Sequence, residues 1–261
     1  MRDGEGRPGP RIDGSRRNGS DGELEVAPGV MISSALCVYL EKPAAVIVCD
    51  LHLGMEAAAQ AEGAFFPKRQ KPVLMKRLER ILDRFRPELF VIDGDFKHNF
   101  GRDMRHEMEE VKEVFDHLDS RTQVVLTKGN HDNYLKNILP DTPLPGSTLV
   151  GDSFVCHGHR DLPALESFNG LKVLAHEHPA LKLQDSVGAR VSAPAFVFDE
   201  ASRTLVLPAL SPLAAGADIL REGPRSPFLR MLDRRRFRLF AVSEQGILDF
   251  GSAGVLEAAM G

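Results

Sequence analysis

The sequence predicts an α/β sandwich in which a largely parallel β-sheet packs against a second, more antiparallel sheet. Two patterns predict it. In the first half of the chain, short apolar runs alternate with amphipathic segments of helical period, which is typical of parallel strands joined by crossover helices. In the second half, short strand-like segments punctuated by Gly, Pro and Asp follow one another with few helices between them. We therefore expect one sandwich and not two independent domains.

The first half supplies the strands and helices of the parallel sheet. Its apolar runs are short and flank turn residues such as Lys42–Pro43, which favours buried strands. Each helical segment carries apolar residues on one face, Leu74, Leu78, Ile81, Leu82 and Phe85 in one and Met108, Val111, Val114, Phe115 and Leu118 in the other. The expected order is strands 35–40 and 44–49, helix 68–86, strand 89–92, helix 103–118 and strand 123–126.

The second sheet is expected from six short segments. They are residues 148–150, 153–156, 171–174, 195–198, 203–207 and 237–242. We assign all of residues 23–261 to a single domain. Residues 1–22 are rich in Gly, Arg, Asp and Ser and contain almost nothing to bury, so we expect a disordered tail, whose arginines either contact nucleic acid or are simply solvated.

Composition and charge argue against several classes of protein. The 261 residues are 43% hydrophobic and 27% charged, which is ordinary for a globular protein. The net charge of −4 argues against a generally basic nucleic-acid binder, although it is compatible with a local basic patch. No apolar run is long enough to span a membrane, and no apolar segment follows the N-terminus as in a secretory signal. Cys37, Cys49 and Cys156 form no CxxC pair, which favours a reducing, cytoplasmic compartment.

Polar clusters follow five of the apolar runs. In an open α/β sheet ligands collect at the carboxyl ends of strands, so these clusters can converge in space although they are far apart in sequence. Each cluster alone has an ordinary explanation, because Gly-Asp often forms a turn and His-x-His often lies on a surface. The clusters are Asp50-Leu51-His52, Asp93-Gly94-Asp95, Gly129-Asn130-His131-Asp132, His157-Gly158-His159 and His176-Glu177-His178.

Taken together, the clusters have the composition of a metal site. Carboxylates mixed with imidazoles, without thiolate, suit Mn²⁺, Fe or Zn better than Ca²⁺ or a structural zinc. The donors outnumber the ligands of one tetrahedral site, and two metal ions that share a bridging carboxylate would use them well. The glycine before Asn130 is expected to let the chain turn sharply enough to present the three polar residues that follow it.

The ordered set D-L-H, G-D, G-N-H-D, H-G-H and H-E-H resembles the five-motif signature of the calcineurin-like metallophosphoesterases. The segments DLHLGME, GDFKHNFG, TKGNHDNYL, AHEHPAL and LVLPALSPLAAGADIL are similar to an archaeal phosphoesterase branch. That branch is related to the nuclease subunit of the double-strand-break repair complex and to DNA-ligase-associated phosphoesterases. The resemblance covers residues 30–255. It implies a four-layer α/β/β/α sandwich, with two mixed sheets face to face and a dimetal site at the carboxyl ends of the strands.

The resemblance also implies a role for each donor. Asp50, His52 and His178 would bind the first metal, Asn130, His157 and His176 the second, and Asp95 would bridge both. His131 would face the scissile phosphate as general acid or electrostatic stabiliser, with Asp132 orienting it. Two divalent ions are expected, Mn²⁺ first, with Fe, Zn, Co or Ni as alternatives. The implied reaction is hydrolysis by in-line attack of a metal-bound hydroxide.

The sequence departs from the family pattern at two positions. Ala175 stands where the last motif usually has glycine, and it could shift His176 slightly. Asp93 adds a carboxylate beside Asp95, where an uncharged residue is more usual, and is either a third acidic group or a turn residue. Asp95 is the expected bridge because Gly-Asp is the matching pair.

Four further residues are candidates for substrate contact. Lys97 and His98 either reach a phosphate or lie in a solvated loop. Arg160 either binds a phosphate or pairs with Asp161, and His159 is expected to support the ligands without binding the metal.

The expected function is hydrolysis of phosphodiester bonds in nucleotides, cyclic nucleotides or nucleic acid. The alternatives are a non-catalytic scaffold of the same fold and a phosphomonoesterase or protein phosphatase. The absence of an obvious DNA-capping domain favours a small or single-stranded substrate. We expect no membrane partner, and the oligomeric state stays open, with a homodimer among the options.

Overall fold

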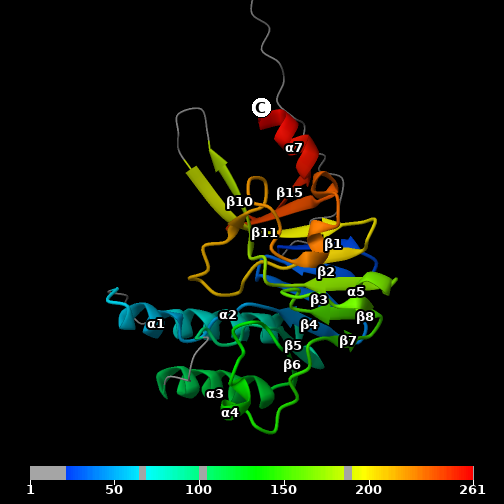
Figure 1. Cartoon of the computed structure of the whole chain (residues 1–261). Coiled ribbons are helices and arrows are strands. Elements are labelled where there is room, and N and C mark those ends of the chain that lie inside the picture. The colour runs from blue at the N-terminus through cyan, green and yellow to red at the C-terminus, as the bar shows by residue number, and fades with distance from the viewer. Residues whose placement is uncertain (1–21, 65–68, 100–104, 185–189, 261) are drawn as a thin grey trace, which may run out of the picture.

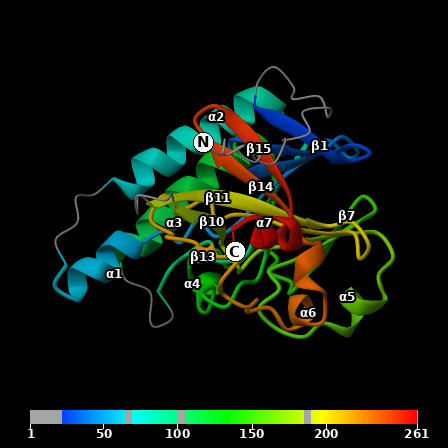
Figure 2. The same ribbon diagram turned by 90° about the horizontal axis from the view of Figure 1, so that it is seen from above.

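The computed structural model describes residues 22–64, 69–99, 105–184 and 190–260. Within these ranges, two β-sheets lie face to face and helices cover their outer sides (Figure 1; Figure 2). The four-layer sandwich is confirmed. The predicted tail lies outside the described residues, except for Gly22, which forms part of a turn.

The first sheet has six strands in the order β1-β2-β3-β4-β5-β6. β4, β5 and β6 pair in parallel, as predicted, and β1 to β4 pair antiparallel. The strands are β1 (Glu23–Ala27), β2 (Val30–Ser33), β3 (Cys37–Leu40), β4 (Ala45–Val48), β5 (Leu89–Asp93) and β6 (Gln123–Thr127). The β1–β2 hairpin was not predicted, because its strands are short and β1 carries two glutamates.

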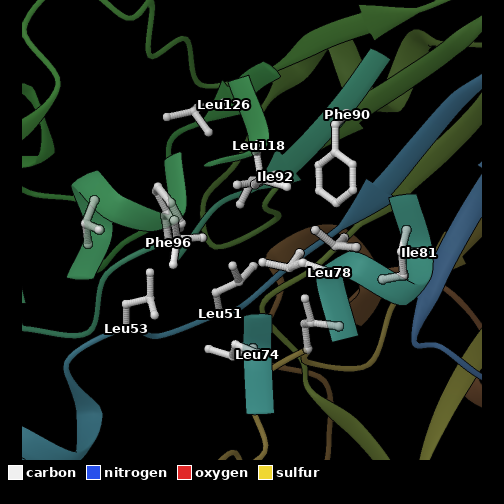
Figure 3. Packing of buried hydrophobic residues seen from close by; sticks show 14 of the residues in the cluster. Leu51, Leu53, Leu74, Leu78, Ile81, Phe90, Ile92, Phe96, Leu118 and Leu126 are labelled. Carbon is white, nitrogen blue, oxygen red and sulfur yellow. The ribbon is translucent and has the colours of Figure 1, made fainter. Parts of the chain in front are cut away.

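Helices α2 (Gln70–Phe85) and α3 (Arg105–Asp119) cover the outer face of this sheet. Their apolar faces form one core with strands β4 and β5, shown in Figure 3. The predicted inward residues contact this core. Most are fully buried, whereas Phe85, Met108 and Phe115 are half-buried at its edge. α1 (Met55–Ala61) and the single turn α4 (Leu135–Ile138) follow strands β4 and β6.

The second sheet has nine strands, with β13-β10-β11-β12-β9-β8-β7 along one path, β14 paired with β11, and β15 paired with β14. Its strands are β7 (Thr148–Val150), β8 (Ser153–Cys156), β9 (Leu171–Leu174), β10 (Pro179–Gln184), β11 (Arg190–Asp199), β12 (Thr204–Val206), β13 (Ala217–Asp218), β14 (Arg238–Ser243) and β15 (Gly246–Ser252). Its outer face packs on α5 (Pro163–Ser167), α6 (Pro227–Arg230) and α7 (Ala253–Met260), and the short 3-10 helix η1 (Arg234–Arg236) contacts α7. No helix in the described ranges is long and apolar enough to cross a membrane.

The long β10–β11 hairpin was only partly predicted. β11 was expected over residues 195–198 but begins at Arg190, and its first half is largely exposed. The prediction missed this extension because Pro194 lies within β11, and a proline normally argues against a strand interior. In Figure 1 the hairpin projects from the body of the molecule.

A second core between the two sheets places their strand ends side by side. Ile47 and Val91 of the first sheet pack there with Val155 and Val173 of the second. At the carboxyl ends, the Asp50 carboxylate accepts a hydrogen bond from the His176 backbone at 3.2 Å. The loops after β4, β5 and β6 therefore meet those after β8 and β9, and these five loops carry the five polar clusters.

Candidate dinuclear metal site

Asp50, His52 and His178 form the first group of potential ligands. One donor atom from each lies within 4.8 Å of the others. The two Nε2 atoms of the histidines are 3.3 Å apart, and His178 Nε2 lies 3.1 Å from Asp50 Oδ1. Asp50 is fully buried and His52 almost so. Three donors from two sheets thus point at one position.

Asp95, His157 and His176 form the second group, with the same closeness of donor atoms. Asn130 joins it, because its Oδ1 lies 3.2 Å from His157 Nε2. From the sequence we expected Asn130, His157 and His176 to bind this second metal ion and Asp95 to bridge both ions.

Asp95 lies between the two groups. Its Oδ2 is 3.2 Å from His157 Nε2 of the second group and 3.8 Å from His52 Nε2 of the first. Its Oδ1 accepts a hydrogen bond from the backbone of His131 at 2.8 Å. One carboxylate oxygen is therefore directed between the groups while the other fixes the loop after β6. This is the placement that a bridging ligand requires.

His131 approaches the same carboxylate from a third side. Its Nε2 lies 3.9 Å from Asp95 Oδ2, and its Nδ1 contacts the carbonyl oxygen of His98. The rings of His98 and His131 are stacked, with centroids 5.2 Å apart. His52, His98 and His131 also have ring nitrogens within 4.8 Å of one another. However, the His52 atom that meets His98 is Nδ1, on the opposite side of the ring from the Nε2 that joins the first group.

Asp132 occupies a different position from the expected one. Its carboxylate accepts hydrogen bonds from the backbone N–H groups of Asp95 and Gly129 at 2.8 Å and of Phe96 at 2.9 Å. The expectation that it orients the His131 ring is corrected, since the carbonyl of His98 takes that place. Asp132 instead ties the loop after β5 to the loop after β6.

Strained backbone conformations concentrate at this site. Left-handed φ angles are uncommon for residues other than glycine and cost on the order of 1–3 kcal/mol each. Among the described residues, ten non-glycines have positive φ, and half of them are candidate ligands. These are Asp50 (54°), His52 (49°), Asp95 (49°), His176 (70°) and His178 (46°). Sequence patterns gave no sign of this strain, which holds the donors at sharp bends after the strands.

Two glycines make room for the donors. A Cβ at Gly129 would lie 2.1 Å from Asp95 Oδ1, and one at Gly94 would lie 2.4 Å from His157 Nδ1. Gly94 also has φ of 72°, whereas Gly129 does not adopt a left-handed conformation. The chain bends at Asn130 and His131 directly after Gly129, and the close approach of Asp95 leaves no room for a side chain at this glycine.

The charges of the buried donors fit divalent cations. Burial raises the pKa of Asp50, but His178 and His157 hold it well below its usual value. Burial lowers the pKa of His157, but Asp50 and Asp95 more than reverse this and raise it to about 10. Burial lowers the pKa of His52 to about 3. The site thus combines ionised carboxylates with an uncharged imidazole at His52, a set of donors that suits positive ions.

The chemistry of the donor set agrees with this. Asp50 Oδ1 is buried and makes no hydrogen bond of normal geometry within the described chain, although His178 Nε2 is close to it. Oxygen and nitrogen donors that converge on one position from several loops are typical of metal ligands. The residues present therefore fit two divalent ions.

A comparison with protein families identifies the class of protein. The model of the calcineurin-like phosphoesterases matches residues 45–214 of the 261. The chain belongs to the calcineurin-like phosphoesterase family. This family comprises metal-dependent phosphoesterases, and all five polar clusters fall within the matched residues.

Two solved structures are similar to this calcineurin-like phosphoesterase. The crystal structure of the nuclease MPE from Pseudomonas putida has a TM-score of 0.62 and 20% identity, and the match covers 87% of this chain and 98% of that one. The phosphoesterase YfcE from E. coli has a TM-score of 0.40 and 17% identity, with coverages of 78% and 95%. No curated protein shows significant similarity. The first structure has the same fold as this chain.

The structure places the two residues that depart from the phosphoesterase pattern, Ala175 and Asp93. Ala175 is fully buried in the core between the sheets. Asp93 ends β5 and lies behind the site, where its Oδ1 accepts a hydrogen bond from the Thr127 hydroxyl and its carbonyl lies 3.1 Å from His157 Nδ1. Burial raises the pKa of Asp93 to about 7. Asp93 therefore supports His157 from behind.

The expected substrate contacts divide into two pairs. His98 and His159 lie at the site, and the His159 ring is tilted by 56° relative to the His157 ring, with centroids 5.3 Å apart. Lys97 does not lie there. It is fully buried, with its Nζ against the carbonyl of Asn99 and 3.8 Å from Glu107, so both of its predicted positions, on a phosphate or in a solvated loop, are wrong.

Arg160 is exposed and lies over Gly146, where a Cβ would meet its guanidinium at 2.4 Å. The alternative ion pair with Asp161 is not formed within the described chain.

Sequence reasoning missed a supporting residue, Gln70 at the start of α2. Its side chain donates to the carbonyls of Leu51 and His52 and to the hydroxyl of Ser211. The Ser211 backbone in turn donates to the Asp50 carbonyl at 3.1 Å. Gln70 is buried at a position where a helix start is usually solvated, and only a three-dimensional structure could reveal this link between α2 and the first ligand group.

Proposed function

We propose that this protein hydrolyses phosphodiester bonds in nucleotides, cyclic nucleotides or nucleic acid, using two divalent metal ions of which Mn²⁺ is the first choice. The observation that carries the proposal is the position of Asp95. Its Oδ2 lies between His52 of one donor group and His157 of the other. A carboxylate shared in this way is typical of dinuclear hydrolytic sites.

Each side chain has a distinct task in the proposal. Asp50, His52 and His178 would hold one ion, and Asn130, His157 and His176 the other. When bound, such ions lower the pKa of a coordinated water and neutralise charge on a phosphoryl group. The His157 ring is kept in place by the Asp93 carbonyl behind it, which leaves Nε2 for the ion.

His131 is proposed to act on the phosphate. Because its Nδ1 is directed to the His98 carbonyl, that nitrogen carries a proton and Nε2 faces the site. Nε2 can then donate a proton only when the ring is an imidazolium, and in that form it can stabilise phosphoryl oxygens and protonate the leaving oxygen. His159 offers a second contact, since its Nδ1 is buried and makes no hydrogen bond within the described chain.

The test is hydrolysis of model esters by protein reconstituted with Mn²⁺. We expect turnover of bis-p-nitrophenyl phosphate that needs the metal, and slower turnover of the monoester p-nitrophenyl phosphate. No metal-dependent turnover of either ester would support a scaffold instead. A preference for the monoester would support a phosphomonoesterase. Single- and double-stranded DNA and 2′,3′-cyclic nucleotides would then define the substrate.

We also propose a reducing, cytoplasmic location, supported by three cysteines that are free and buried.

A further inference from the structure

Two adjoining cavities extend from the candidate metal site along α2. The first, of about 160 Å³, is lined by His178 and Ser211 at the metal site and by Arg77 of α2. The second, of about 430 Å³, is lined by Arg77, Arg80 and the 243–244 turn between β14 and β15. The two share Leu36, Arg77 and Pro194. They therefore form one groove, bordered by α2, the 208–216 loop and the β10–β11 hairpin.

The helical period of α2 places its arginines along this groove. Gln70, which holds the His52 carbonyl, and Arg77 are seven residues apart, so they lie on the same face about 10 Å apart along the axis. Arg80 is about one turn further on. The guanidinium groups thus mark a path that starts at a metal-ligand loop and runs outward.

In the part of the chain that the structure describes, neither arginine has an acidic partner. Arg77 donates to the Leu210 carbonyl, and within the described chain Arg80 forms no ion pair or hydrogen bond. Burial lowers the pKa of Arg77, and the positive charge of Arg80 lowers it further. The exposed Glu244 at the far end is the acidic residue that lines the groove. A bound anion would reduce the electrostatic repulsion between these two positively charged side chains.

We infer that this groove binds the phosphate backbone of a single nucleic-acid strand next to the phosphate that is cleaved, with Arg77 and Arg80 contacting successive phosphates. This inference rests on the proposed function. The volume of the second cavity lies within the range of about 300–1,000 Å³ that suits small ligands, whereas a duplex requires a more extended basic surface. Among the described residues that line the groove there is no Phe, Tyr or Trp for base stacking, so binding is expected to be independent of sequence and sensitive to salt.

The test is binding of a fluorescein-labelled ten-nucleotide oligothymidylate, followed by fluorescence anisotropy with the full chain in EDTA and again with Mn²⁺ in a His131→Ala background. Arg80→Gln and Arg77→Lys are compared with Lys76→Gln, which removes a charge from an exposed position of α2 outside the groove. We expect Arg80→Gln to bind about fivefold more weakly at 0.1 M salt and to lower the salt slope by about 0.7. Lys76→Gln should bind like the parent, and Glu244→Gln more tightly.

Equal binding by Arg80→Gln and Lys76→Gln would overturn the inference, as would tighter binding of a ten-base-pair duplex than of the single strand. Arg80 is exposed, so its replacement is not expected to impair folding, and a thermal melt checks this. The EDTA arm does not depend on catalysis. If the parent fails to hydrolyse bis-p-nitrophenyl phosphate while Arg80→Gln still loses oligonucleotide binding, the proposed function fails and the groove stands.

Discussion

The ring of His131 meets the carbonyl oxygen of His98 through Nδ1, and this contact decides which ring nitrogen faces the metal site. The backbone of His98 is itself held by the buried carboxylate of Glu107 on α3, whose Oε1 accepts from the N–H groups of His98 at 3.0 Å and Asn99 at 2.7 Å. The orientation of a proposed catalytic imidazole therefore depends on a helix that lies on the outer face of the sheet.

Glu107→Gln should lower kcat about tenfold while the Mn²⁺ content stays at the parent value. The glutamine amide oxygen can still accept one hydrogen bond. The variant lacks the negative charge of Glu107, which offsets Lys97 and attracts the two backbone N–H groups. Glu109→Gln on the exposed face of α3 is the matched control and should behave like the parent. Unchanged kcat in correctly folded Glu107→Gln would contradict this positioning role.

His131→Ala should reduce turnover of bis-p-nitrophenyl phosphate by about 10²–10⁴-fold, the usual contribution of a positioned acid or base. Metal content should not change, because His131 Nε2 is 3.9 Å from Asp95 Oδ2 and His131 Nδ1 is directed to the His98 carbonyl. His106→Ala, on the exposed face of α3, controls for loss of a histidine. If His131→Ala loses metal, His131 is a ligand and its proposed role is wrong.

Much of the site could be predicted from the sequence. Strand periodicity was enough to predict the strands at 89–92 and 123–126. The rule that ligands gather at strand ends was enough to predict a site at the clusters after them. The structure brings those clusters together, although Asp50 and His176 are 126 residues apart.

The remainder depends on side-chain directions that sequence spacing does not determine. Asp132 binds the backbone of a loop that is distant in sequence, and Lys97 points inward to Glu107 on α3, where spacing alone does not direct it. The same holds for Gln70, whose three acceptors come from two loops. The left-handed φ of Asp50 is likewise a product of the assembled fold and not of local propensity.

Asp95→Asn should weaken metal binding and Asp93→Asn should not, although the two residues lie close together at the end of β5 and in the loop after it. Asp95→Asn keeps an acceptor for the His131 backbone but removes the charged oxygen between the two donor groups. We expect it to bind fewer than two Mn²⁺ ions per chain by elemental analysis. Asp93→Asn should keep both ions, since burial already favours the neutral form of Asp93 and its Oδ1 can still accept from Thr127. The reverse result would make Asp93 the bridge.

Metal binding should release a proton from His157 and should therefore strengthen as the pH rises. In the metal-free protein, the carboxylates of Asp50 and Asp95 outweigh burial and raise the pKa of His157 to about 10, so its ring is protonated at neutral pH. A metal ion can bind His157 Nε2 only after that proton leaves. Below pH 10 the affinity should thus rise by up to about tenfold per pH unit, and it should be lost progressively toward acid pH as protons compete.

Calorimetric titration with Mn²⁺ in buffers of different ionisation enthalpy measures this release directly. Burial lowers the pKa of His178, but Asp50 more than reverses this, so His178 can contribute to the release as well. At pH 7.5 we therefore expect His157→Asn to release about one proton fewer per chain than the parent, because it offers no ring to deprotonate. His159→Asn is the matched control, because burial first, and then the nearby His157, lower the pKa of His159 to about 4 and leave it no proton to release. A proton release that is equal in the parent and in His157→Asn would show that another group carries the linkage.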